Sequence, residues 1–163
     1  MRHKIPKISE VNLELIDVEF YFENPIRAED IGINISVKAS FSKDNKIIFF
    51  IHLRYLLVSP EIERDSLFHT DYLSFIEVEE VNWGQSETVE IEQAELAHLL
   101  GMSLLMVRGS VANRLSSNSL SSYSLPIFRP LDLLKKSLEE KGNSFVLTNE
   151  LIGHKASDKG SKS

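Results

Sequence analysis

Residues 31–42 alternate apolar and polar side chains without interruption, and this alternation constrains the fold more than any other part of the chain. In "IGINISVKASFS" every second position, from Ile31 to Phe41, is apolar, and small, amide or charged residues occupy the others. Successive side chains of a strand point to opposite faces, so we predict a half-buried strand with one face in water. The turn sequence "SKDNK" follows at 42–46, and the next strand is expected to return antiparallel.

That returning strand is predicted at residues 47–58, "IIFFIHLRYLLV". It is apolar on both faces apart from His52 and Arg54, which is typical of a central strand. A fourth strand is predicted at residues 67–81, with Ile76 and Val78 inward and the neighbouring glutamates outward.

An earlier strand is predicted at residues 11–23, "VNLELIDVEFYFE". Its alternation changes phase between Leu15 and Ile16, and a β-bulge is expected there. No helical pattern separates these strands, so parallel βαβ crossovers are not expected.

One long helix is predicted at about residues 92–118, with two stripes along it. The first is a core stripe of large residues at helical spacing: Leu96, Leu100, Leu104, Val111 and Leu115. The second contains smaller residues and is our candidate subunit interface: Ala97, Gly101, Leu105, Gly109 and Ala112.

The two internal glycines of this helix each cost about 1 kcal/mol relative to alanine. They either let a helix of a second subunit approach closely or accommodate bulky side chains of the sheet. The additional apolar surface of Met102, Met106 and the run "LLMV" favours the first interpretation, an oligomer with two-fold symmetry.

A shorter helix is predicted at residues 130–141, after the extended linker "LPIFRP". The predicted fold class is therefore α+β, a four-stranded antiparallel sheet packed by one long helix and a shorter C-terminal helix. We expect one domain over residues 1–142 and a largely disordered C-terminal extension over 143–163.

Composition narrows the class of function. The chain has 163 residues, 42% of them hydrophobic, and a formal net charge of −6, which disfavours nucleic-acid binding. It contains no cysteine. The basic N-terminal sequence has no apolar run behind it and the longest apolar run is interrupted by charge, so we expect neither a signal peptide nor membrane insertion, and a cytoplasmic location.

The sequence shows no motif for catalysis, and no catalytic residue or cofactor is predicted. The five histidines have no paired metal-ligand spacing. His69 and Asp71 are two apart on a predicted strand, which is a weak metal signal, and no metal site is predicted.

Several segments resemble the SecB family of export chaperones. "FYFENP" is similar to the end of that family's opening strand, and "AHLLG" at 97–101 to the start of its long helix. Arg108 falls where that helix carries an arginine, and "SLPIFRPLDLL" is similar to the link and opening of the last helix. The resemblance covers roughly residues 8–140.

The resemblance implies an ATP-independent holdase that binds unfolded polypeptides, assembled as a homodimer or homotetramer through the long helices. It also implies docking of the SecA translocase ATPase on an acidic face, at positions matching Glu19, Glu23 and Asp71. Client contacts could involve aromatic and methionine side chains, with the first two preferred because they lie in predicted loops: Trp83, Tyr123, Phe128, Met102, Met106, Phe20 and Phe22.

Two alternatives remain open from the sequence. The first is a chaperone of the same fold devoted to one partner, such as the antitoxin of a toxin–antitoxin pair. The second is a small-molecule-binding or enzymatic α+β domain with a closed cavity lined by His52, Arg54 and Tyr55.

Overall fold

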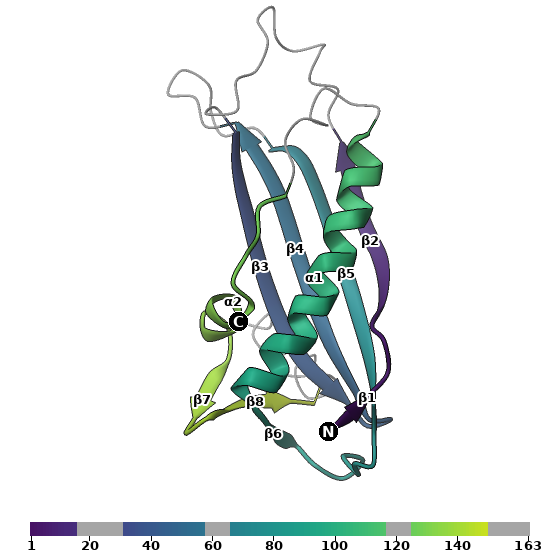
Figure 1. Cartoon of the computed structure of the whole chain (residues 1–163), viewed down its shortest axis with the longest axis vertical. Helices are drawn as coiled ribbons and strands as arrows, with labels where there is room; N and C mark the ends of the chain where they lie inside the picture. The colour runs from purple at the N-terminus through teal and green to yellow at the C-terminus, as the bar shows by residue number, and fades with distance from the viewer. Residues whose placement is uncertain (16–30, 58–65, 117–124, 150–163) are drawn as a thin grey trace, which may run out of the picture.

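The computed structural model describes residues 1–15, 31–57, 66–116 and 125–149, which form two antiparallel sheets and two helices (Figure 1). The large sheet contains β1 (Arg2–His3), β2 (Lys7–Leu15), β3 (Ile31–Ser42), β4 (Lys46–Leu57) and β5 (Ser66–Glu79). The small sheet contains β6 (Thr88–Glu92), β7 (Glu139–Lys141) and β8 (Ser144–Thr148). The helices are α1 (Gln93–Leu115) and α2 (Pro130–Lys135).

The predicted central hairpin is confirmed. β3 pairs antiparallel with β4 in unbroken register from Ile31↔Leu57 to Ser42↔Lys46. β4 pairs on its other side with β5, so it is central, as predicted. β1 and β2 both pair with β5.

The first strand differs from its prediction. β2 begins at Lys7 rather than Val11, and its register shifts between Glu10 and Asn12, which leaves Val11 as an extra residue. The bulge predicted after Leu15 and the rest of the predicted strand lie outside the described residues.

The small sheet was not predicted, and it corrects three boundaries. Residues 88–92, expected to lead directly into the helix, form β6 with Val89 and Ile91 buried. α2 ends at Lys135, not at residue 141, because the chain then turns to pair β7 with β8.

The predicted boundary at residue 142 is also wrong for the segment that follows it. Lys141 pairs with Ser144, so Gly142 and Asn143 form a two-residue hairpin connection, in which Gly142 has φ +58°. Phe145 and Leu147 of β8 are fully buried in the core. Residues 150–163 lie outside the described part.

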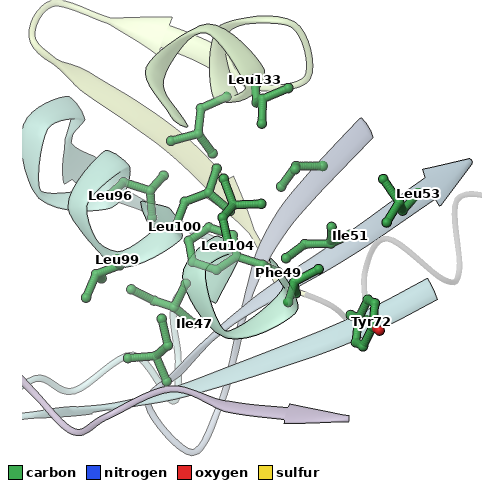
Figure 2. Close-up of a cluster of buried hydrophobic side chains, with 14 of the residues drawn as sticks. Ile47, Phe49, Ile51, Leu53, Tyr72, Leu96, Leu99, Leu100, Leu104 and Leu133 are labelled. Carbon is green, nitrogen blue, oxygen red and sulfur yellow. The ribbon is translucent and has the colours of Figure 1, made fainter. Parts of the chain in front are cut away.

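α1 crosses one face of the large sheet diagonally (Figure 1). All five residues of its predicted core stripe are buried, and Leu99, Ser103 and Val107 are buried with them. Four leucines of α1 lie beside Ile47, Phe49 and Ile51 of β4 (Figure 2): Leu96, Leu99, Leu100 and Leu104. This packing is the main hydrophobic core of the described residues.

Polar contacts also join α1 to the sheet. The hydroxyls of Ser74 on β5 and Ser103 are buried and lie 2.7 Å apart. The Tyr72 hydroxyl donates to Ser110 Oγ at 3.0 Å, and Arg114 pairs with Glu10 of β2 at 2.9 Å. These contacts fix the rotation of the helix about its axis as well as its position.

No helix among the described residues is long and apolar enough to span a membrane.

The turn between β3 and β4 depends on Asn45. This residue has φ +58°, in the left-handed region, and its side-chain oxygen accepts the backbone N–H of Trp83 at 3.1 Å. Its own carbonyl accepts the N–H of Val78 at 2.8 Å.

We predict that Asn45→Ala lowers the free energy of unfolding by about 2 kcal/mol, because alanine disfavours this φ and loses the contact to Trp83. Asn45→Gly keeps the backbone conformation and loses only the side-chain contact, so it should cost about 1 kcal/mol. Urea unfolding of the three proteins measures both values. Equal stability of wild type and Asn45→Ala would contradict this account of the turn.

Candidate functional site

A groove of about 460 Å³ lies between α1 and the extended segment at residues 125–130. The segment runs on the same side of the large sheet as α1 and leads into α2 (Figure 1). Most of the lining is apolar, and it comes from two parts of the chain that are distant in sequence: Ala97, His98, Gly101, Met102, Leu104, Leu105, Arg108, Leu125, Pro126, Ile127, Phe128 and Pro130.

The α1 wall of the groove contains the first part of the predicted small-residue stripe. Ala97, Gly101 and Leu105 follow at intervals of four residues, so they lie on one side of the helix. Leu105 is 69% exposed. Gly109 and Ala112 continue the stripe beyond the groove and are exposed.

The other wall is extended because Pro126 and Pro130 fix the backbone on both sides of three residues. Leu125 is buried, and Phe128 packs partly against the core. Ile127 is 84% exposed. Within the described residues, the main chain of Ile127 and Phe128 makes no backbone hydrogen bond, so these groups are available to another extended chain.

The structure tests whether the two glycines of α1 accommodate bulky side chains of the sheet. A Cβ added at Gly101 would lie 3.6 Å from Cγ of Pro130, and a Cβ at Gly109 would meet no atom of the described part of the chain within 4 Å. Neither glycine accommodates a side chain of the sheet, so that interpretation is wrong. A Cβ at Gly101 would make an ordinary van der Waals contact with the start of α2, and Gly109 borders open space among the described residues.

The predicted client-binding residues separate into groups. Met102 and Phe128 line the groove, and Met106 is 37% exposed on α1 beside it. Trp83 lies elsewhere, between β5 and β6, with its ring edge against Phe41 at a centroid distance of 5.7 Å. Tyr123, Phe20 and Phe22 lie outside the described residues.

Sequence reasoning missed several groove residues, of which Leu125, Pro126 and Ile127 are the most informative. The signal that could have found them is "LPIFRP", where apolar side chains stand between two prolines. The prolines keep such a segment out of a helix interior and out of a central strand. Its apolar side chains are therefore expected to pack on the surface of another element, where they can line a groove.

Of the three residues predicted to form the acidic docking face, the structure describes only Asp71. Glu19 and Glu23 lie outside the described residues. Asp71 is on the face of β5 away from α1, as predicted, but it is only 6% exposed rather than directed into solvent. Its carboxylate accepts from Asn12 Nδ2 at 3.0 Å and contacts His52 Nδ1.

Burial alone would raise the pKa of the Asp71 carboxyl. The hydrogen bonds from Asn12 and His52, together with positive charge on His52 and His69, outweigh burial and lower that pKa below its usual value. Asp71 is therefore a carboxylate at neutral pH, held inside a polar cluster. His52 bonds to Asp71, and Arg54, two residues further along the same face of β4, is exposed.

The closed cavity proposed as an alternative is also wrong. His52 and Arg54 lie on the face of β4 away from α1, whereas Tyr55 is fully buried on the opposite face, in edge contact with Phe68. Burial raises the pKa of Tyr55 to about 12. Side chains on opposite faces of one strand cannot line one cavity.

No family model matches the chain, and no curated protein matches it. A comparison with solved structures finds the SecB-like chaperone Rv1957 of Mycobacterium tuberculosis, which was solved in complex with a ChAD peptide from the Rv1956 HigA1 antitoxin. The two chains are 10% identical, the match covers 78% of this chain and 91% of that one, and the TM-score is 0.45.

Proposed function

We propose that this protein is an ATP-independent holdase chaperone that binds unfolded polypeptide segments in the groove between α1 and residues 125–130. The observation that carries the proposal is the pair of large apolar side chains, Leu105 and Ile127, that line one groove and stay mostly exposed, at 69% and 84%. Two large apolar side chains exposed together in one groove are typical of a binding site, whereas a single exposed apolar residue is not.

The dimensions of the groove favour an extended chain. Its lining on α1 runs from Ala97 to Arg108, which corresponds to about 16 Å along the helix axis. An extended polypeptide covers that length with about five residues. The free main-chain groups of Ile127 and Phe128 add backbone hydrogen bonds that do not depend on the client's sequence.

The proposal also rests on the resemblance of "AHLLG" and "SLPIFRPLDLL" to the SecB family, because these two stretches supply both walls of the groove. Delivery of clients to SecA is a hypothesis that rests on the resemblance alone. Asp71 is a poor docking contact for it, since its carboxylate is enclosed by Asn12 and His52.

We predict that Leu105→Ser combined with Ile127→Ser weakens binding of a labelled unfolded peptide by about 100-fold. Each side chain contributes about 1–2 kcal/mol of apolar burial, and about 1.4 kcal/mol is tenfold in affinity. Fluorescence anisotropy without ATP measures the dissociation constant. Both side chains are exposed, so the variant should keep its stability.

The matched control is Ile5→Ser, because Ile5 is 79% exposed but does not line the groove. It should bind the peptide as wild type does. An equal loss in the control, or no loss in the groove variant, would refute the proposed site. The groove variant should also suppress the aggregation of a protein diluted from urea less well than the Ile5→Ser control does. The range of peptide sequences bound by the wild type separates a general holdase from one devoted to a single partner.

We further propose that the protein assembles as a homodimer or homotetramer through the part of the α1 stripe beyond the groove, where Gly109 and Ala112 are exposed. Support comes from the open space at Gly109, where no atom of the described residues lies within 4 Å of an added Cβ. A neighbouring helix can approach closely only at such a position.

For this interface, Gly109→Leu should shift the protein from oligomer to monomer, with the free energy of unfolding of each subunit unchanged or raised by about 1 kcal/mol from helix propensity. Light scattering gives the mass. Lys38→Leu, on the exposed face of the sheet away from α1, adds a comparable side chain and should leave the mass unchanged. A wild-type monomer at micromolar concentration would rule out the interface.

A further inference from the structure

The face of the large sheet away from α1 carries a compact cluster of His52, His69 and Asp71. The register places His52 of β4 directly opposite Asp71 of β5, and His69 lies two residues before Asp71 on the same face. Tyr72, the next residue, bonds to Ser110 of α1 on the other side, so the cluster and the groove lie on opposite faces of the sheet.

The three side chains converge on one point. His69 Nε2 lies 3.3 Å from His52 Nδ1 and 3.4 Å from Asp71 Oδ1, and His52 Nδ1 contacts the same carboxylate oxygen. Two ligand atoms of a tetrahedral zinc site, each about 2.0–2.1 Å from the metal, are separated by about 3.3–3.4 Å. Two of the three distances between ligand atoms therefore already match those of a tetrahedral zinc site.

The surroundings fit a metal site rather than a chance contact. Asn12 of β2 donates to the second oxygen of Asp71 at 3.0 Å, which orients the first oxygen toward the two imidazoles. All three ligands stand on paired strands, which hold them more rigidly than loops would. The side chains of His52 and His69 are 31% and 20% exposed, so an ion and a water molecule can reach them.

The flanking charges are nearly balanced. Arg54 of β4 and Glu14 of β2 both lie opposite His69, one on each side, and both are exposed. Both charges are exposed and opposite in sign, so solvent screens them and they contribute little to the electrostatic potential at the cluster. Among the described residues, the buried charge at the cluster is the Asp71 carboxylate, which favours a cation.

We propose that His52, His69 and Asp71 bind one divalent transition-metal ion of the zinc class, with water completing the coordination. Imidazole and carboxylate ligands suit Zn²⁺, and a set of two histidines and one carboxylate leaves an open position. The ion would link β4 to β5 on the far side of the sheet from α1. The site is independent of the proposed groove.

The test is calorimetric titration of the full chain with ZnCl₂ at neutral pH, with Co²⁺ absorption as a second readout of histidine coordination. We expect one equivalent of Zn²⁺ per chain and a higher melting temperature in its presence. His52→Ala and His69→Gln should each weaken binding at least tenfold, and Asn12→Ala should weaken it about tenfold by releasing Asp71.

Two control variants exclude the other histidines. His3 and His98 have ring centroids 6.2 Å apart, so His98→Ala tests whether that pair takes the ion, and His154→Ala tests the remaining histidine. Both should bind as wild type does. No saturable binding up to millimolar Zn²⁺, unchanged binding in the His52→Ala His69→Gln double variant, or binding lost in a control would overturn the proposal.

Discussion

The packing of the α1 leucines on the large sheet is the interaction on which the rest of the structure depends. Leu96, Leu99, Leu100 and Leu104 meet Ile47, Phe49 and Ile51 of β4, and these side chains are buried almost completely (Figure 2). A helix with its side chains is about 10 Å wide, whereas four strands spaced by about 4.8 Å span more than that. One helix therefore cannot cover the face, and the area beside β3 is left to α2 and the segment before it.

The groove lies between α1 and the segment that leads into α2, which together cover this face of the sheet. On one side, α1 presents small residues, and a Cβ at Gly101 would make an ordinary van der Waals contact with Pro130. On the other side, the prolines hold residues 127–129 extended, with Leu125 and Phe128 turned toward the core and Ile127 left in solvent. The same packing that stabilises the fold thus leaves apolar side chains and main-chain groups exposed along one line.

A single register connects the two faces of the sheet. The pairing that places Ile51 and Tyr72 side by side under α1 also places His52 opposite Asp71 on the other face. A slip of one residue would turn both sets over, so the core and the polar cluster are specified together. Asn12 belongs to the same arrangement, because the bulge at Val11 brings it opposite Asp71.

Much of this architecture could be predicted from local periodicity. Residues 31–42 form β3 with the predicted bounds, and the leucine spacing of α1 identified its buried stripe. The short strands β6 and β8 were missed because five residues give a weak signal, and the glutamates of β6 are typical of a helix start as well. The burial of Asp71 could not be predicted, because it depends on Asn12 and two histidines brought in by strand pairing. The groove could not be predicted either, since its walls are distant in sequence.

The most direct test of the central claim is site-specific photocrosslinking of the protein to a bound unfolded peptide. A photoreactive residue at position 127 should yield an adduct with the peptide, and one at Leu105 should do so from the opposite wall of the groove. The same probe at Ile5 or Lys38 should yield none. Adducts confined to Lys38, on the other face of the sheet, would show that polypeptide binds elsewhere and would contradict the account.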